Sequence, residues 1–306
     1  MRKTNTANNT TAVGILYAVM AFTVWGFLPI YWKLLNQIPA GQILAHRILW
    51  SFVFVFALLI FNGRLKGLKQ VISNRKKLIG ILFSAVIISI NWGIYIWAVN
   101  SNHIIETSMG YYINPLITVF MGMVILKEKL YFWQIISLIL ASIGVLITTV
   151  QYGKIPWIAL SLALTFALYG LGKKKINIDS MTGLALETFI IMPAALGYII
   201  LKQLNGTGIL NMIPLSTTVM LLLSGIVTAM PLLWFAKGTK RIPLSMIGFI
   251  QYISPTINLF LGIFVFKEQF TNIHFLSFGF IWCGLILYSL SQTSILKNMK
   301  QKPHHQ

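Results

Sequence analysis

Two side chains that ordinarily carry a full charge stand inside long apolar stretches of this sequence. Arg47 lies within ILAHRILWSF (43–52), and Glu187 lies within LALETFIIMPAAL (184–196). Ionisable residues are rare in membrane-spanning segments, where they usually face a bundle interior or a water-filled cavity. We therefore predict that Arg47 and Glu187 contact a polar solute. The alternatives are that Arg47 extends toward the outer lipid headgroups and that Glu187 is a neutral, hydrogen-bonded structural carboxyl.

Proton transfer is a second chemistry that ionisable residues in such positions can support. Glu187 is the only acidic residue well inside an apolar stretch, and a buried carboxyl can exchange protons near neutral pH. If transport through this protein is coupled to protons, Glu187 is the first candidate, followed by Glu106 and His46. Transport without proton coupling is the alternative.

Pro115 and Pro255 stand near the middle of two further apolar stretches. Proline has no backbone N–H and clashes with the carbonyl four residues earlier, so the carbonyls of Tyr111 and Gln251 lose their usual donors. In a bilayer such a carbonyl must meet protein, water or substrate. We predict two broken helices that face each other across a central cavity, with the prolines as hinges; two packing kinks are the alternative. The polar residues expected beside this cavity are Tyr111, Tyr112, Asn114, Gln251, Tyr252 and Ser254.

An aromatic and polar group stands in NWGIYIWAVN (91–100), which contains Asn91, Trp92 and Tyr95. Residues four apart share a helix face, so Asn91 and Tyr95 can bind one solute together. Aromatic rings bury apolar solute surface, while the Tyr hydroxyl offers a hydrogen bond. The alternative is an interfacial aromatic belt, where Trp and Tyr concentrate. Trp25, which lies deeper in another stretch, is a further candidate for substrate binding.

Neither a catalytic site nor a metal site is predicted from the ionisable residues. The chain holds five acidic residues, five His and one Cys in 306 positions. An intramembrane enzyme typically needs clustered metal ligands or an activated nucleophile with its base, and these residues are scattered. We therefore expect no cofactor. The formal net charge of +19 falls in short clusters between apolar stretches, unlike the basic face of a nucleic-acid-binding protein.

Membrane-spanning helices are the elements that must position these residues. Charged residues make up 9% of the chain and apolar residues 57%, whereas an average soluble domain has about 25% charged residues. A helix rises about 1.5 Å per residue, so it needs about 20 apolar residues to cross about 30 Å of hydrocarbon. The sequence predicts ten such spans, at residues 12–32, 41–61, 78–99, 107–126, 131–151, 156–172, 181–201, 216–236, 244–266 and 271–291.

Basic residues alternate between the connections of these spans. The clusters at 64–77, 127–129, 173–175 and 237–241 fall on the same side as both termini, whereas the other side has few Lys residues. Positive residues favour the cytoplasmic side of a membrane. We therefore predict a multi-pass protein of the cytoplasmic membrane, with both termini in the cytoplasm.

The second half of the chain repeats the first. YYINPLITVFMGMVILKEKL (111–130) matches QYISPTINLFLGIFVFKEQF (251–270) without a gap at an offset of 140. The two segments share a Tyr, the central Pro, a Gly and a terminal Lys-Glu pair. The same offset places Arg47 on Glu187. This correspondence indicates a duplication rather than chance similarity between apolar helices.

Each half contains five predicted spans, and an odd number of spans reverses the orientation of the second copy. The predicted fold class is therefore all-α integral membrane, with ten transmembrane helices as two inverted five-helix repeats. The repeats are expected at 1–152 and 153–295, followed by a cytoplasmic tail at 296–306. This architecture is typical of alternating-access carriers.

Specific stretches extend along nearly the whole chain, among them AVMAFTVWGFLPIYWKLL (18–35), ETSMGYYINPL (106–116), PWIALSLALTFALYGLGKKK (156–175) and GFIQYISPT (248–256). They resemble the EamA family of the drug/metabolite transporter superfamily, and within it the RarD-type proteins. Members of that family carry two five-helix repeats. The resemblance implies a cytoplasmic-membrane permease of the drug/metabolite class.

Together these features favour a secondary transporter, a permease or exporter of a small organic solute, drug or metabolite that works by alternating access. Its expected partners are that small-molecule substrate and membrane lipid, with no nucleic acid, and a homodimer is compatible with the sequence. The alternatives are a non-transporting membrane subunit or sensor, a passive channel, and an intramembrane enzyme.

Overall fold

The computed structural model describes residues 2–101, 103–209, 213–267 and 271–292, and the regular elements in these ranges are all helices. The first half contains α1 (Arg2–Lys33), α2 (Ala40–Phe61), α3 (Leu65–Ile72), α4 (Arg75–Asn100), α5 (Ile104–Ile125) and α6 (Phe132–Tyr152). The second half contains α7 (Trp157–Lys175), α8 (Ser180–Leu204), α9 (Leu215–Thr239), α10 (Leu244–Gln251), α11 (Ile253–Phe260), the π-helical turn η1 (Leu261–Val265) and α12 (Asn272–Gln292). The predicted tail at 296–306 and Glu268 lie outside the described residues.

Within these ranges, nine helices are long and apolar enough to cross a membrane. One of the nine is the combined segment Leu244–Val265, which contains α10, α11 and η1. The chain is therefore a multi-pass membrane protein, as predicted. The remaining predicted span, 156–172, also forms a helix, α7, which ends in three Lys residues and is not among the nine.

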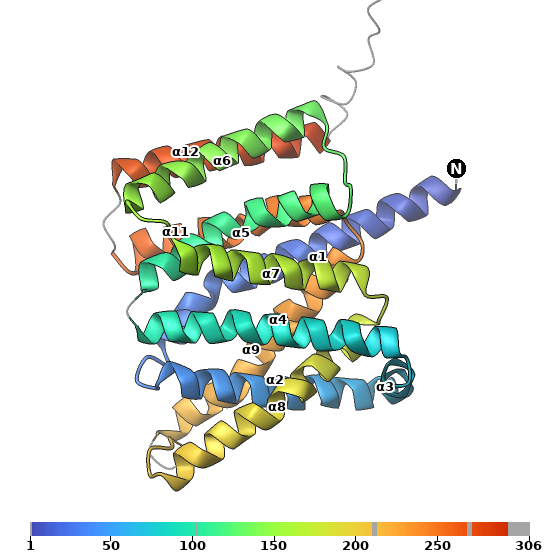
Figure 1. The fold of residues 1–306 in the computed structure, drawn as a ribbon, viewed down its shortest axis with the longest axis vertical. Helices are drawn as coiled ribbons and strands as arrows, with labels where there is room; N and C mark the ends of the chain where they lie inside the picture. The colour runs from blue at the N-terminus through green and yellow to red at the C-terminus, as the bar shows by residue number, and fades with distance from the viewer. Residues whose placement is uncertain (1, 102, 210–212, 268–270, 293–306) are drawn as a thin grey trace, which may run out of the picture.

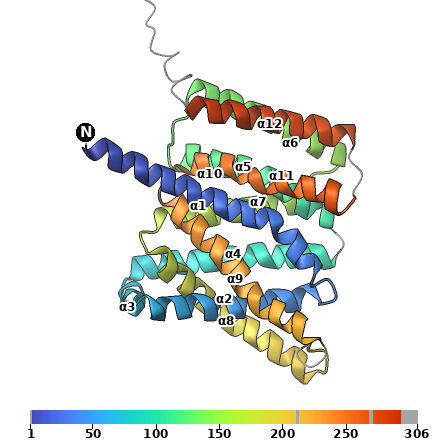
Figure 2. The same cartoon turned by 180° about the vertical axis from the view of Figure 1, so that it is seen from behind.

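Most of the long helices lie side by side, roughly perpendicular to the long axis of the molecule, whereas α1, α8 and α9 run obliquely to it (Figures 1 and 2). α6 and α12 form a pair at one end of the row, and α2 packs on α8 and α9 at the other end (Figure 1). Between these ends, α5 packs on α7 and α10, α4 packs on α7, and α1 packs on α9 and α11. Each of these contacts joins a helix of the first half to a helix of the second half. The two halves are therefore interleaved in one bundle.

Small residues let α6 and α12 approach each other closely. Ser277 Oγ donates a hydrogen bond to the carbonyl of Gly144 at 2.7 Å. A Cβ at Gly144 would lie 2.5 Å from the Ser277 carbonyl oxygen, and a Cβ at Gly284 would lie 2.7 Å from the Ser137 carbonyl oxygen. Ser137 and Ser277 are 140 residues apart, as are Gly144 and Gly284, so each pair occupies equivalent positions in the two halves. Each helix therefore offers an equivalent small-residue face to the other, which is a common way to pack helices in membranes.

The two prolines have different effects on their helices. α5 continues unbroken through Pro115, whereas the equivalent span divides at Tyr252 into α10 and α11, shortly before Pro255. The prediction of two broken helices is therefore wrong for Pro115. Neighbouring helices can accommodate a proline without a break, and α5 is packed against both α7 and α10. Gly248 of α10 approaches so closely that a Cβ there would lie 2.7 Å from the Pro115 carbonyl oxygen.

Both proline-containing spans nevertheless end in the same turn. Lys127 has a φ of 54° and Lys267 has a φ of 58°, and among the described residues they are the non-glycine residues with positive φ. Residues other than glycine seldom adopt this conformation. In both spans the preceding residue, Leu126 or Phe266, donates its N–H to the carbonyl five residues earlier. The repeated sequence thus produces a repeated local structure.

Candidate functional site

Glu128 and Glu106 hold the N-termini of two helices in place. Glu128 accepts hydrogen bonds from the backbone N–H groups of Leu244 (2.7 Å) and Ser245 (2.8 Å) at the start of α10. Glu106 accepts a hydrogen bond from the Ile158 N–H at the start of α7 (3.2 Å) and from a tyrosine hydroxyl of α6 (2.8 Å). A carboxylate at a helix N-terminus satisfies free backbone donors and complements the helix dipole. Both glutamates therefore have structural partners.

Asp179 has a similar place at the start of α8. Its carboxylate accepts hydrogen bonds from the N–H groups of Met181 (3.1 Å) and Thr182 (3.2 Å) and forms an ion pair with Arg64 at 3.0 Å. Burial raises the pKa of Asp179, but the hydrogen bonds from Thr182 and Met181 and the charge of Arg64 outweigh it. The pKa of this carboxyl therefore lies below its usual value.

Glu187 forms a buried ion pair inside the bundle. Lys173 Nζ lies 2.6 Å from both carboxylate oxygens of Glu187, and the Tyr169 hydroxyl donates to one of them at 3.2 Å. Only 1% of Glu187 and 5% of Lys173 is exposed. The sequence placed Lys173 in the connection after the span at 156–172, and this was wrong, because α7 continues to Lys175 and Lys173 contacts Glu187 of α8. Glu187 therefore has a cationic partner within the protein.

Lys240 lies directly after α9, near the same ion pair. Its Nζ donates a hydrogen bond to the Ile178 carbonyl. Burial, together with the positive charge of Lys173, lowers the pKa of Lys240 to about 8. The side chain therefore loses its proton more readily than a solvated lysine.

Lys240→Met is expected to change how stability depends on pH. A lysine in the unfolded chain has a pKa of about 10.4, so between about pH 8 and about pH 10 the unfolded state binds more protons than the folded state. The contribution of Lys240 to the stability of the folded protein therefore rises with pH across this range. Thermal unfolding of both proteins in one detergent checks the expectation. Parallel pH profiles for the wild type and the variant would contradict it.

Arg47 of α2 has aromatic neighbours in place of a carboxylate. Its guanidinium carbon lies 5.2 Å from the ring centre of Trp32 in α1 and 5.1 Å from a ring centre of Trp92 in α4. Its charge also acts on Tyr95 and Tyr111, whose side chains interact with each other. Contact with a ring face attracts a cation but leaves N–H donors unused. Arg47 Nε is buried without a hydrogen-bond partner in the described part of the chain.

These five residues, Trp32, Arg47, Trp92, Tyr95 and Tyr111, are called the Arg47 cluster below. The side chains of the cluster are not all covered: 45% of the Tyr111 surface is exposed, and Arg47 is only partly buried. Part of the Arg47 cluster is therefore not covered by other protein atoms.

Four of the predicted substrate-binding residues meet in the Arg47 cluster, and Trp32 is the member that the sequence did not indicate. Trp32 stands seven residues after Trp25, which is about two turns of helix, and this spacing was the available signal. Trp25 itself packs in an aromatic core, with its ring centre 5.6 Å from those of Phe166 and Phe235. Trp25 thus lies among other rings rather than beside Arg47.

Other predicted site residues form hydrogen bonds between helices. Asn91 Nδ2 donates to the Leu162 carbonyl at 2.9 Å and to the Thr165 hydroxyl at 2.8 Å, which ties α4 to α7. The Ser254 hydroxyl donates to the Phe22 carbonyl at 2.6 Å, which ties α11 to α1. Asn91 and Ser254 therefore have partners within the protein.

A polar group also joins α5 to α10 beside the break in the second proline span. The Thr118 hydroxyl lies 3.1 Å from Asn114 Oδ1 and 3.4 Å from Gln251 Oε1, and all three residues are buried. Tyr252 is 1% exposed, and its hydroxyl is buried without a hydrogen-bond partner in the described ranges. The ring of Tyr112 packs edge-on against a phenylalanine of α12, with ring centres 5.3 Å apart. These residues lie at helix contacts.

The described residues include no group of three or more His, Cys, Asp and Glu side chains that could hold a metal ion. His46 is 3% exposed, and its Nδ1 is buried without a partner in the described ranges. Cys283 lies exposed on α12. Neither His46 nor Cys283 therefore belongs to a group of metal ligands in the described ranges.

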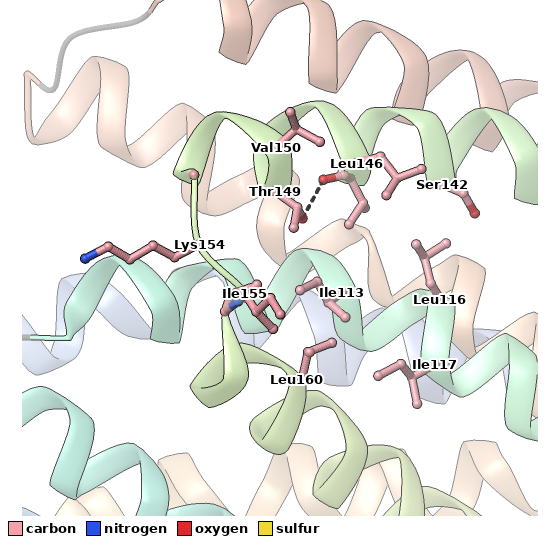
Figure 3. A pocket seen from close by; sticks show the side chains of 13 residues that line it. Ile113, Leu116, Ile117, Ser142, Leu146, Thr149, Val150, Lys154, Ile155 and Leu160 are labelled. Carbon is pink, nitrogen blue, oxygen red and sulfur yellow. Dashed lines mark hydrogen bonds between the residues drawn. The ribbon is translucent and has the colours of Figure 1, made fainter.

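A separate crevice of about 790 Å³ lies between α5, α6 and the start of α7 (Figure 3). Its walls are mostly apolar and include Ile113, Leu146, Val150 and Leu160, with Lys154 at one side. None of the predicted site residues lines it. A crevice of this composition suits hydrocarbon better than a polar solute.

Comparison with known proteins gives the family. The EamA-like transporter family matches residues 12–150 and, a second time, residues 154–290. "Uncharacterized transporter YojE" of Bacillus subtilis (strain 168) is 47% identical over 286 residues, which cover 92% of this chain and 95% of that protein. "Protein RarD" of Escherichia coli (strain K12) is 39% identical over 278 residues, which cover 91% of this chain and 94% of that protein.

A solved protein structure with 15% sequence identity superposes on this fold with a TM-score of 0.71, covering 93% of this chain and 100% of that chain. This likeness concerns the fold alone. The family match, by contrast, extends over both halves, and the curated relatives align over nearly their whole length. The chain therefore belongs to the EamA-like transporter family, with relatives of the RarD type.

Proposed function

We propose that this protein is a secondary transporter that moves a small organic solute across the cytoplasmic membrane by alternating access. In this proposal ten helices, including α7, cross the membrane as two inverted five-helix repeats, residues 1–152 and 153–295. Both termini lie in the cytoplasm, on the side of the basic clusters. The names of the relatives and the family support a transport role.

The observation that carries this proposal is a correspondence between helix contacts. When each helix is replaced by its equivalent in the other half, a contact between two helices becomes another contact that is also present. At the repeat offset, α1, α2, α4, α5 and α6 correspond to α7, α8, α9, the α10–η1 segment and α12. The contact of α5 with α7 then corresponds to that of α11 with α1. The contact of α4 with α7 corresponds to that of α9 with α1, and the contact of α2 with α9 corresponds to that of α8 with α4. Each of these contacts is present, which supports a two-fold relation between the halves.

The different conformations of the two proline spans support a carrier mechanism. Two copies of one repeat can exchange conformations, so that the pathway closes on one face of the membrane as it opens on the other. The span with Pro115 is continuous and the span with Pro255 is broken. A carrier that is open to one side requires such a difference between its two equivalent proline spans. When it opens to the other side, the span with Pro115 takes the broken conformation and the span with Pro255 the continuous one.

The inverted topology is tested by labelling single cysteines in a Cys283→Ser background. Lys127 and Lys267 are both exposed and occupy equivalent positions in the two repeats, so inversion places them on opposite faces. A maleimide that does not cross membranes is expected to label Lys267→Cys in intact cells and Lys127→Cys only after permeabilisation. Labelling of both variants from the same face would contradict the inverted repeat.

Transport itself is tested by counterflow in proteoliposomes with a panel of metabolites and drugs. A carrier exchanges labelled for unlabelled solute and saturates with concentration, whereas a passive channel does neither. The absence of flux and of stabilisation by any member of a broad panel would contradict the transport function. Flux that appears only with a stoichiometric protein partner would indicate a subunit instead.

A further inference from the structure

We propose that the Arg47 cluster binds the negative group of an organic monoanion, a carboxylate next to a flat apolar part, as the substrate of this carrier. This inference rests on the proposed transport function and adds the chemical class of the solute. Arg47 supplies the positive charge, and the four rings of the cluster supply the apolar surface. The carboxylate and the ring of such a solute then meet complementary groups at one place.

The first argument is the balance of charge. An ionised group inside a membrane protein is unfavourable unless it is paired or reaches water. In the described part of the chain no ion pair involves Arg47. A solute with one negative charge relieves this imbalance when it binds. The described acidic residues are already engaged elsewhere: Glu106, Glu128 and Asp179 at helix N-termini, and Glu187 with Lys173.

The second argument is the difference between two equivalent positions. Arg47 and Glu187 occupy the same place in the two repeats. Glu187 has a buried cation, Lys173, within 2.6 Å, whereas Arg47 has the aromatic rings of Trp32 and Trp92 beside it. The protein therefore neutralises one of the two charges and leaves the other to a ligand.

The third argument is the geometry of the donors. A guanidinium is planar and presents parallel N–H groups that match the two oxygens of a carboxylate. Trp32 and Trp92 contact Arg47 through their rings, so they do not consume those donors, and Nε has no partner among the described residues. Tyr111, which is 45% exposed, adds a hydroxyl and an accessible ring at the same place.

The composition of the cluster also sets the expected selectivity. It contains a single basic residue, which suits one negative charge rather than two and repels a cation. Its two tryptophans and two tyrosines offer ring faces and edges against which a flat apolar group can pack. A small aromatic carboxylate therefore has the charge and shape that the cluster favours.

Binding is tested with three probes of similar size: phenylacetate, its neutral amide phenylacetamide, and the cation phenethylammonium. Thermal stabilisation and tryptophan fluorescence of the full chain in detergent measure the affinity. We expect phenylacetate to bind the wild type more tightly than either of the other probes. Arg47→Gln is expected to weaken phenylacetate binding about 10- to 100-fold, because it removes hydrogen bonds between charged groups. Arg47→Lys keeps the charge but loses the planar donors, so its effect is expected to be intermediate.

Lys202→Gln is the matched control, because Lys202 also lies over an aromatic ring, that of Tyr198, but outside the cluster. It is expected to leave the affinity for phenylacetate unchanged. Arg47→Gln is expected to unfold at the same temperature as the wild type or higher, because it removes a charge that lacks a counter-ion. Lost binding in this variant is then not a consequence of unfolding. Equal affinity of the three probes, or an unchanged affinity in Arg47→Gln, would overturn the proposal.

Counterflow with the same probes separates this proposal from the transport function. If phenylacetate binds through Arg47 but no solute is exchanged, the carrier function fails and the anion site stands. If phenylacetamide is exchanged and phenylacetate is not, the carrier function stands and the anion site fails. A lipid headgroup is the other source of a single negative charge. Stabilisation by phosphatidylglycerol vesicles but not by phosphatidylcholine vesicles or phenylacetate, lost in Arg47→Gln, would overturn the assignment to a solute.

Discussion

Lys173→Met is expected to lower the free energy of unfolding by about 3–5 kcal/mol, because it leaves the Glu187 carboxylate buried without its partner. Lys173 Nζ lies 2.6 Å from both carboxylate oxygens, and 1% of Glu187 is exposed. Water therefore cannot replace the ammonium group. The midpoint of thermal unfolding in detergent, followed by the fraction of protein that stays monodisperse after heating, measures the loss.

Two further variants serve as controls for this loss. The double variant Lys173→Met with Glu187→Leu leaves no unpaired charge, so it is expected to recover much of the stability. Arg64→Gln breaks the ion pair with Asp179, whose two side chains are 54% and 45% exposed. It is expected to cost less than about 1 kcal/mol, because solvent screens such a pair. Equal losses in Lys173→Met and Arg64→Gln would show that the buried pair has no special role in stability.

Gly225→Ala is expected to force α2 and α9 apart. A Cβ at Gly225 would lie 2.5 Å from the carbonyl oxygen of Trp50 and closer still to its carbonyl carbon. Overpacking typically costs about 1–3 kcal/mol, and here backbone atoms rather than a flexible side chain must move. The same shift weakens the hydrogen bond from Ser51 Oγ to the Gly225 carbonyl, now 3.1 Å long. The midpoint of thermal unfolding checks this expectation.

Gly93→Ala and Gly279→Ala are the matched controls for the added methyl group. Both glycines lie within helices, and a Cβ at either position would meet nothing within 4 Å. Alanine is favoured over glycine inside a helix by about 0.5–1 kcal/mol, so these variants are expected to be as stable as the wild type or slightly more stable. If Gly225→Ala behaves as these two do, the close contact between α2 and α9 is not required for stability.

The sequence determined where the chain enters and leaves an apolar environment. Hydropathy is summed over neighbouring residues, so a span predicted at 41–61 was found as α2, Ala40–Phe61. Local repeats behave in the same way, because a similar stretch of sequence produced a left-handed lysine at both 127 and 267. Candidate site residues could also be found in part, since charges and polar aromatic side chains are conspicuous in such an apolar chain.

Only the tertiary structure decided which of those residues meet. Trp32, Arg47 and Trp92 belong to three different helices, and their contact depends on how each helix is rotated about its own axis. That rotation is set by packing between segments far apart in the sequence, which no local pattern records. Asn91, which directly precedes Trp92 in the sequence, instead donates its hydrogen bonds to α7.

The two prolines and Lys173 also show which features the sequence determined and which the tertiary structure decided. Pro115 and Pro255 have similar local sequences, but one helix is continuous and the other is broken, so local sequence alone does not decide the break. Lys173 was assigned to a connection because the sequence does not mark the end of α7. Composition alone was sufficient to indicate a membrane protein. Burying a charge in a bilayer is unfavourable at any position, so such a chain contains few charged residues overall. Packing between helices decided which of the few charges are satisfied within the protein, because an ion pair forms only where two particular side chains are brought together.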